Sequence, residues 1–469
     1  MPKAPASAIY FTSLELESVR CFGRTQKLDL TDGKGKPAQW TLLLGDNGVG
    51  KTTLLQCLSW MRPVPVQKSG YEGPGASLTR GPLGPALQDE ENDVLEALLR
   101  AGKPRALTLN AELSFNKPLS YQDRTRKKAP RAKPKKIHTR IKLLYTNTKE
   151  LRDYERSGTT IQRLGKFVEP LIVTYGASRH MGRQNLEQSF LEDPIAGRLG
   201  GLTELYDAEE ILLRLDHAAA KKAYRPRALE NRQLERLKEV LAQVLPDVRR
   251  ASDIKILAPK IEGFSAPSGV RFKTFSGFVS LSALSLGYQT TLAWTTDLAW
   301  RLFRNYPDSG NPLEEPAIVI IDEIDLHLHP LWQRDIMDQL GEIFPRTQFI
   351  ATAHSPLMVQ SAPNANFAVL KRDKEEVVIS NDPHVVKSWR IDQILNSELF
   401  GLPYSRDKET EKLFYEREKL LDKSYLTNYD KAKLKRIDEK VAELPTEAVE
   451  DQTTADFIKR ATSLIKRYK

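Results

Sequence analysis

Residues 45–53 read Gly-Asp-Asn-Gly-Val-Gly-Lys-Thr-Thr and directly follow the apolar run of residues 40–44. A glycine-rich turn between a strand and a helix exposes consecutive backbone N–H groups, and the helix points its positive dipole end at the same place. A polyphosphate binds at such a turn. In this pattern Lys51 reaches the β- and γ-phosphates and Thr52 ligates Mg²⁺. The segment therefore predicts a nucleotide site.

An acidic pair, Asp322 and Glu323, closes the continuous apolar run of residues 317–321, which is typical of a strand buried on both faces of a parallel sheet. A carboxylate at that point can hold the water shell of Mg²⁺, and a second one can polarise an attacking water. Asp322 lies 271 residues after Lys51 (322 − 51), so we expect a large insertion between the two strands.

Two further segments could complete a phosphate site. Ser285 and Gly287 open an apolar helix, and a serine at a helix N-terminus is either a γ-phosphate docking point or an ordinary cap. His354 ends the next apolar strand, residues 348–354, where it either points toward the phosphates or serves the packing.

The order of these motifs resembles that of the ABC-type ATPases, in the RecF/SMC/OLD-like branch. Residues 14–22 look like the N-terminal hairpin of that branch, and residues 321–330 look like its run after the catalytic glutamate. The resemblance spans residues 9 to about 360, although residues 60–280 are anchored only by 175–179. It implies an α/β fold: a P-loop NTPase of ABC-ATPase type with an inserted helical lobe and a mainly helical C-terminal region.

The resemblance also implies roles for single residues, with ATP and Mg²⁺ as the cofactors. Glu323 is the expected general base, and His354 contacts the γ-phosphate. Ser285 and Gly287 form a signature motif that acts on the ATP of a second copy in a head-to-tail dimer, although Tyr288 departs from the common pattern. The expected phosphate ligands are Gly45, Asn47, Gly48, Gly50, Lys51, Thr52 and Thr53. The expected metal ligands are Thr52 and Asp322. Residues 325–329 link the two sites, and Arg20 and Arg179 are expected further nucleotide contacts.

The chain divides, on this interpretation, into four parts. Residues 1–185 hold the first part of the ATPase domain and 186–250 a helical insertion. Residues 251–365 hold the second part of the ATPase domain, and 366–469 form a helical region for partner or oligomer contacts.

The net charge of +10 resides in one segment. Residues 117–142 hold eleven Lys or Arg and one acid, so the remainder carries 60 basic (71 − 11) and 60 acidic (61 − 1) side chains. We expect a loop between two strands there. It binds DNA or RNA through phosphates, docks on an acidic protein, or is only a solvated loop.

Composition excludes several classes of protein. The two cysteines, Cys21 and Cys57, rule out a disulfide framework and a Cys₄ metal site, and they fit a reducing cytoplasm. No apolar stretch reaches the ~20 residues that a membrane span needs, and the N-terminus lacks the apolar core of a secretory signal. We therefore expect a cytoplasmic protein without a membrane partner.

Similar stand-alone ATPases are typical of bacterial anti-phage systems of the Septu, PARIS and retron-associated types. The resemblance implies a homodimer or higher oligomer across ATP that senses infection and controls a nuclease supplied in trans. Residues 362–469 lack the pattern of a Toprim nuclease. The alternative is a DNA-repair or chromosome-maintenance ATPase that binds DNA directly. A transporter subunit and a scaffold that binds ATP without turnover are weaker alternatives, and Glu323 argues against the last.

Overall fold

The computed structural model describes residues 8–61, 98, 100, 106–116, 135–145, 151–158, 170–177, 207–221, 229–257, 269–362, 364–381, 389–397, 400, 407–423 and 425–442. The chain divides into two compact units, residues 1–400 and 401–469. Arg179 and residues 117–134 lie outside the described part of the chain.

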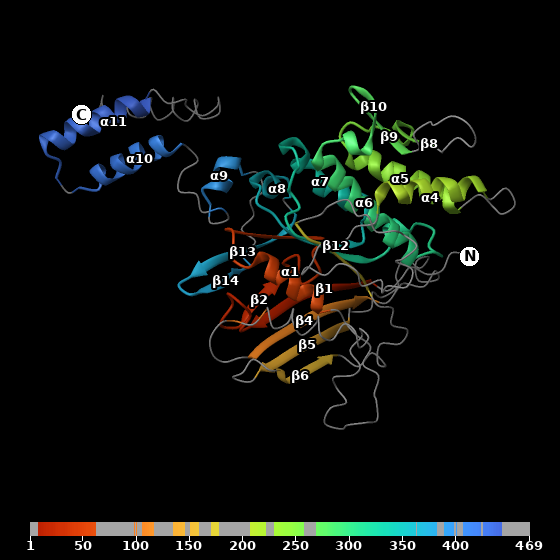
Figure 1. The fold of residues 1–469 in the computed structure, drawn as a ribbon. Helices are drawn as coiled ribbons and strands as arrows, with labels where there is room; N and C mark the ends of the chain where they lie inside the picture. Colours follow the sequence, from red (N-terminus) through yellow and green to blue (C-terminus); the bar gives the residue numbers. More distant parts are fainter. Residues whose placement is uncertain are drawn as a thin grey trace, which may run out of the picture. The chain divides into compact units, whose positions relative to one another are not determined.

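A six-stranded sheet forms the centre of the first unit, in the order β14-β13-β3-β12-β11-β7 (Figure 1). All neighbouring pairs are parallel except β13 and β14. The strands are β3 (Trp40–Gly45), β7 (Leu171–Tyr175), β11 (Ala317–Ile321), β12 (Thr347–Thr352), β13 (Asn366–Asp373) and β14 (Glu376–Ser380).

Both faces of this sheet are covered, which is why its strands are continuous apolar runs. One face packs on four helices in a cluster that includes Leu44, Val319 and Phe349, while the other face contributes Leu43 and Ile320 to a second cluster. The four helices are α4 (Ala208–Lys221), α5 (Leu229–Val244), α6 (Leu286–Asn305) and α7 (Pro330–Ile343).

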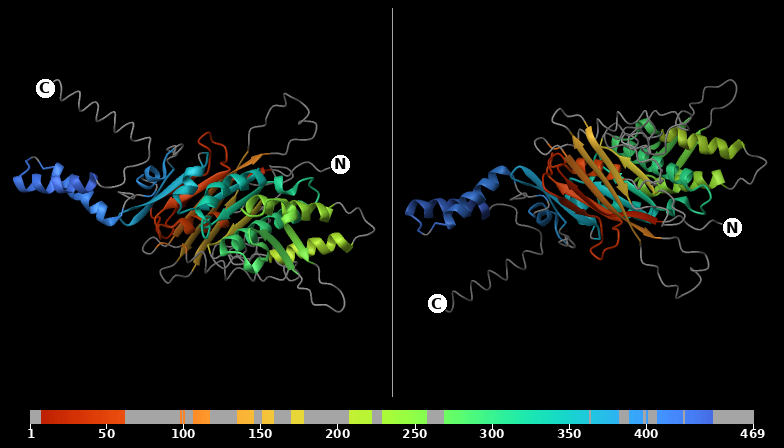
Figure 2. Two further views of the ribbon diagram at one scale, coloured as in Figure 1. Left: turned by 90° about the horizontal axis from the view of Figure 1, so that it is seen from above. Right: turned by 90° about the horizontal axis from the view of Figure 1, so that it is seen from below.

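The second face lies against helix α1 (Lys51–Trp60) and an antiparallel five-stranded sheet in the order β2-β1-β4-β5-β6. Figure 2 shows this sheet as a layer of red to yellow strands. The strands are β1 (Ala8–Glu17), β2 (Gln26–Asp29), β4 (Ala106–Asn116), β5 (Lys135–Tyr145) and β6 (Leu151–Gly158). The buried Gln348 amide joins the two sheets, because it donates to the Phe11 carbonyl and accepts from the Phe11 N–H, each over 2.8 Å.

A smaller antiparallel sheet, β10-β9-β8, follows helix α5. Its strands are β8 (Ile254–Leu257), β9 (Gly269–Thr274) and β10 (Gly277–Ser280), and the short 3-10 turns η4 (Ala251–Asp253) and η5 (Leu281–Ala283) flank it. The expected hairpin over residues 9–30 is present as the pair β1 and β2.

Two expectations need correction. The basic segment 117–142 is not a loop throughout, because residues 135–142 begin strand β5, where Ile137 and Ile141 face the core between exposed cations. That period of two is the pattern of a half-buried strand. The helical C-terminal region does not begin at residue 366, because β13 and β14 extend the central sheet and helices follow only later.

The remaining helices are short or lie in the second unit. Helices α8 (Pro356–Ser361) and α9 (Ile391–Leu395) belong to the first unit. Helices α10 (Lys408–Leu421) and α11 (Asn428–Ala442) form the described part of the second unit, where Leu420 and Ile437 are buried. None of the helices in the described ranges combines the length and the apolar character that crossing a bilayer requires.

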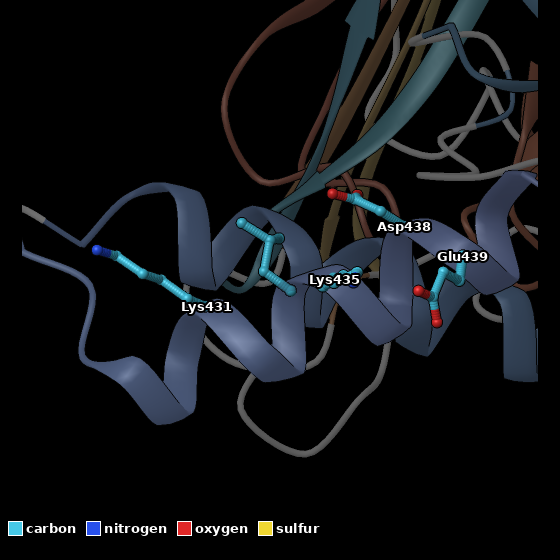
Figure 3. Close-up of a pocket in the computed structure, with 5 residues that line it drawn as sticks. Lys431, Lys435, Asp438 and Glu439 are labelled. Atoms are coloured by element: carbon cyan, nitrogen blue, oxygen red, sulfur yellow. The ribbon is translucent and has the colours of Figure 1, made fainter.

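A depression of about 480 Å³ lies over α11 and is lined by Lys431, Leu434, Lys435, Asp438 and Glu439 (Figure 3). All five residues stand on one helix, and four of them carry charges. The depression is therefore a groove between solvated side chains, and we assign no ligand to it.

Candidate active site

The phosphate loop turns sharply because its glycines adopt backbone angles that other residues avoid. Gly45 and Gly50 have φ values of 138° and 92°. A β-carbon at Gly45 would overlap the Leu370 carbonyl oxygen, and one at Gly50 would overlap the Cys21 sulfur. Both positions therefore require glycine, and the loop passes directly from the end of β3 into the first turn of α1.

Lys51 folds back over this loop. Its Nζ donates to the carbonyl oxygens of Gly45 and Asp46 over 2.7 and 2.9 Å, and the residue is only 6% exposed. Burial lowers the pKa of Lys51, and the nearby carboxylates of Asp322 and Asp46 act in the opposite direction. The ammonium group is thus held at the mouth of the loop, where a phosphate would lie.

The Thr52 hydroxyl donates to Asp322 Oδ2 over 2.8 Å. Asp322 is 5% exposed and directly follows strand β11, so the two predicted metal ligands meet although they come from distant segments. A hydroxyl and a carboxylate are hard oxygen donors that suit Mg²⁺, which takes few protein ligands and completes its shell with water and phosphate. The pair fits the expected ion.

Thr352, which the sequence analysis did not single out, connects both acidic residues. Its hydroxyl donates to Asp322 Oδ1 and accepts from the Glu323 N–H, each over 2.6 Å. Glu323 has a positive φ of 50°, a strained conformation for a residue other than glycine. Thr352 therefore fixes the backbone at the predicted base.

His354 lies two residues beyond β12, and its backbone N–H donates to Asp325 Oδ2 over 2.8 Å. The following residue, Ser355, caps helix α8 and donates to the Gln333 side chain over 2.6 Å. These bonds connect the predicted linking segment 325–329 to the end of β12. The His354 side chain itself is exposed.

Ser285 is the N-cap residue of α6, but its side chain makes no capping hydrogen bond and is exposed. Gly287 is buried against residues 325–329, the predicted linking segment. A β-carbon at Gly287 would overlap the His327 carbonyl oxygen. The Tyr288 hydroxyl donates to Asp247 over 2.9 Å and its ring contacts Trp332, so the residue that departs from the common motif serves packing. Burial raises the pKa of that phenol.

Two arginines lie next to the loop. Arg20 donates to Thr53 Oγ1 and Gln56 Oε1 on α1, each over 3.2 Å. Arg372, which sequence reasoning missed, has its Nη2 3.7 Å from the position of a β-carbon at Gly48. It comes from β13, whose pairing with β3 brings Leu370 opposite Gly45. Arg372 therefore reaches the phosphate loop because it lies on β13, a strand that the sequence analysis did not predict.

Comparison with known proteins places these residues in a family. Residues 41–359 match the family model described as "AAA domain, putative AbiEii toxin, Type IV TA system". This range contains every predicted site residue except Arg20. Together with the sheet order, it confirms the expected α/β P-loop NTPase fold.

The chain is 26% identical over 427 residues to "Septu protein PtuA" of Bacillus mycoides (strain KBAB4), an alignment that covers 89% of this chain and 48% of that protein. It is 41% identical over 118 residues to "Retron Ec83 probable ATPase" of Escherichia coli, covering 25% of this chain and 22% of the relative. The expected resemblance to Septu and retron ATPases is thereby confirmed. The chain spans about half or less of the length of these curated relatives.

The "SMC head domain from Thermotoga maritima" overlaps 80% of this chain and 99% of its own length at 15% sequence identity, with a TM-score of 0.40. At that score the overlap adds nothing to the fold assignment.

Proposed function

This chain belongs to the AAA-domain family whose model matches residues 41–359, and we propose that it binds and hydrolyses ATP at the phosphate loop. The hydrogen bond between Thr52 and Asp322 carries the proposal, because it brings the loop's hydroxyl to the carboxylate that directly follows β11. Glu323 follows at once, so a metal ligand and a base stand side by side.

Each residue has a separate task in the proposed reaction. The backbone N–H groups of the loop, Lys51 and Arg372 hold the phosphates, while Thr52 and Asp322 hold Mg²⁺. The ion supplies charge neutralisation on the β- and γ-phosphates when it is bound. Glu323 accepts the proton of the attacking water, and His354 orients toward the γ-phosphate.

We further propose that two copies assemble head to tail across ATP. The Ser285 side chain does not cap its own helix and is exposed, so it is available to the γ-phosphate held by a second copy. Leu286, the next residue along the chain, and Leu331 near the start of α7 are exposed apolar side chains that such an interface could bury. ATP then stabilises the dimer, and hydrolysis releases it.

The proposed biological setting is an anti-phage defence complex. It is supported by the similarity to a Septu protein along 89% of this chain and to a retron ATPase along a quarter of it. In this proposal the chain is the sensor or regulatory subunit, and a nuclease supplied in trans is the effector.

The test is affinity purification of a tagged Glu323→Gln chain from phage-infected and uninfected cells, with phosphate release measured on the wild-type protein. The proposal requires Mg²⁺-dependent phosphate release, and a nuclease that co-purifies before infection and is lost afterwards. Recovery of only the chain and DNA would instead favour the DNA-repair type of ATPase. Wild-type protein that binds no ATP would reject the enzymatic proposal itself.

A further inference from the structure

Figure 1 shows the small sheet β8–β10 next to helices α4 and α5. Its outer face carries cationic and aromatic side chains. Alternation along the strands buries Ile254, Val270 and Phe272 on the inner face. The outer face carries Lys255 opposite Arg271 and Lys273 opposite Phe278. Three cations and one aromatic ring therefore share a single surface.

Phe275 adds a second ring at the tip of the β9–β10 hairpin. It is 96% exposed, and Phe278 is 41% exposed. The turn is held by other residues: Thr274 Oγ1 donates to the Gly277 carbonyl oxygen over 3.0 Å, and Gly277 supplies the positive φ of 110°. The Phe275 ring is thus required neither by the turn nor by the core.

The rings and cations already contact one another. Lys255 Nζ lies 4.1 Å from the centroid of the Phe278 ring, a cation–π contact that holds the ring in place. Of the neighbouring acids, Asp253 pairs with Lys273 over 3.3 Å and so offsets one cation of the face, while Asp247 accepts from the Tyr288 hydroxyl. Two more exposed cations, Arg249 and Arg250, lie in the turn that precedes η4. The face is therefore net positive.

We propose that this face binds single-stranded nucleic acid, with bases stacked on Phe275 and Phe278 and phosphates near Lys255 and Arg271. Exposed aromatic platforms beside cations are the elements that bind single strands without sequence preference. An acidic protein would satisfy the charges but would leave the fully exposed Phe275 without a planar partner. The proposed site shares no residue with segment 117–142 or with the ATP site. Binding there does not depend on any step of the proposed ATP hydrolysis.

The position of the sheet gives such binding a route to the ATPase. Strand β10 ends at Ser280, and Ser285 follows five residues later (285 − 280) after the turn η5. A bound strand would therefore lie next to the proposed interface between two copies.

The test is fluorescence anisotropy of a labelled oligothymidylate of about 20 nucleotides with the full chain, at several salt concentrations. Phe275→Ala should weaken binding at least about fivefold without changing the salt slope, because base stacking is worth ~1–3 kcal/mol per ring. The double variant Lys255→Gln/Arg271→Gln should lower the slope of log K against log [salt] by about 1.4, at ~0.7 per cation. Phe275→Trp should bind at least as tightly as wild type.

Tyr415→Ala is the matched control, because Tyr415 is an aromatic residue 60% exposed on α10. The proposal is overturned if Phe275→Ala binds like wild type or if Tyr415→Ala loses as much affinity. Displacement of the oligonucleotide by poly-glutamate of equal charge, with no dependence on Phe275, would assign the face to an acidic protein. ATP affinity is measured on the same variants, and its retention separates this site from the ATP site.

Discussion

The Thr52 hydroxyl donates to the Asp322 carboxylate over 2.8 Å across 270 residues of sequence. The sheet order explains the contact, because β3 and β11 flank β12 and all three strands run parallel. Their carboxyl ends meet at one edge, where α/β proteins bind ligands. The third strand supplies Thr352, which bonds the other oxygen of the same carboxylate.

Glu323→Gln should abolish turnover while leaving ATP binding intact. The amide keeps the shape of the side chain but cannot accept the proton of water, and general-base catalysis is worth ~10²–10⁴ in rate. Phosphate release and filter binding of labelled ATP measure the two quantities. The expected loss of turnover is at least ~10²-fold. If the variant instead turned over ATP within a factor of about two of wild type, Glu323 would not be the general base.

Thr352→Val should lower the rate of ATP hydrolysis more than it lowers ATP affinity. The substitution keeps the volume of the side chain but removes the hydroxyl that holds both Asp322 and the Glu323 backbone. Removing one hydrogen bond from the Asp322 carboxylate and one from the Glu323 N–H costs ~1–3 kcal/mol, which corresponds to roughly 5- to 150-fold in rate if the cost falls on the reacting geometry. Thr352→Ser should recover most of the activity. Equal losses in the two variants would indicate a packing role.

The sequence allowed the main elements of the site to be predicted because each carried a local signal. Residues 45–53 combine glycines, a lysine and a strand-to-helix transition, and residues 317–323 combine an apolar run with two acids. Thr352 and Arg372 carried no such signal. A threonine at a strand end is common, and Arg372 reaches Gly48 only because β13 pairs with β3.

The strands β13 and β14 were missed for a physical reason that concerns their charges. Residues 371–376, which span the end of β13, the turn and the start of β14, are all charged, and Lys374 in the turn adopts a positive φ of 57°. High charge suggested solvated helices, whereas the alternation of Val377 and Ile379 with less buried neighbours is the pattern of an edge strand. The same alternation marks the first residues of β5, which high charge had assigned to the basic loop.

Ser285→Arg should block the ATP-dependent dimer and spare ATP binding by the monomer. The arginine would occupy the space that the γ-phosphate of the second copy needs, since Ser285 is the exposed N-cap residue of α6. Ser282→Arg provides the control, because Ser282 is also exposed and lies only three residues upstream in η5. Light scattering of Glu323→Gln chains with ATP and Mg²⁺ measures the assembly. Dimers that persist in Ser285→Arg but not in Ser282→Arg would contradict the proposed interface.

Asp297→Ala should destabilise the first unit by about 3–5 kcal/mol, the cost of breaking a buried ion pair by removing one partner. Asp297 is fully buried on α6, where it accepts from Arg301 and from the Tyr175 hydroxyl, each over 2.7 Å. The urea midpoint measures the loss. Asp297→Leu/Arg301→Met should be the milder change, because it removes both charges. A double variant as unstable as Asp297→Ala would argue against the ion pair as the cause.

Cys57 should remain unreactive toward thiol reagents well above the pH at which an ordinary cysteine reacts. It faces the core from α1, and burial raises its pKa to about 12. An unfolded cysteine ionises near pH 8.5, so the stability that the buried neutral thiol contributes is present below about that pH and is lost as the pH rises toward about 12. In a Cys21→Ser chain, labelling of Cys57 should keep rising between pH 8 and 11 in the native protein. In urea it should level off near pH 9. A native profile that also levels near pH 9 would mean that α1 exposes the face that carries Cys57. Because Lys51 and Thr52 begin the same helix, the phosphate loop would then also be loosely held.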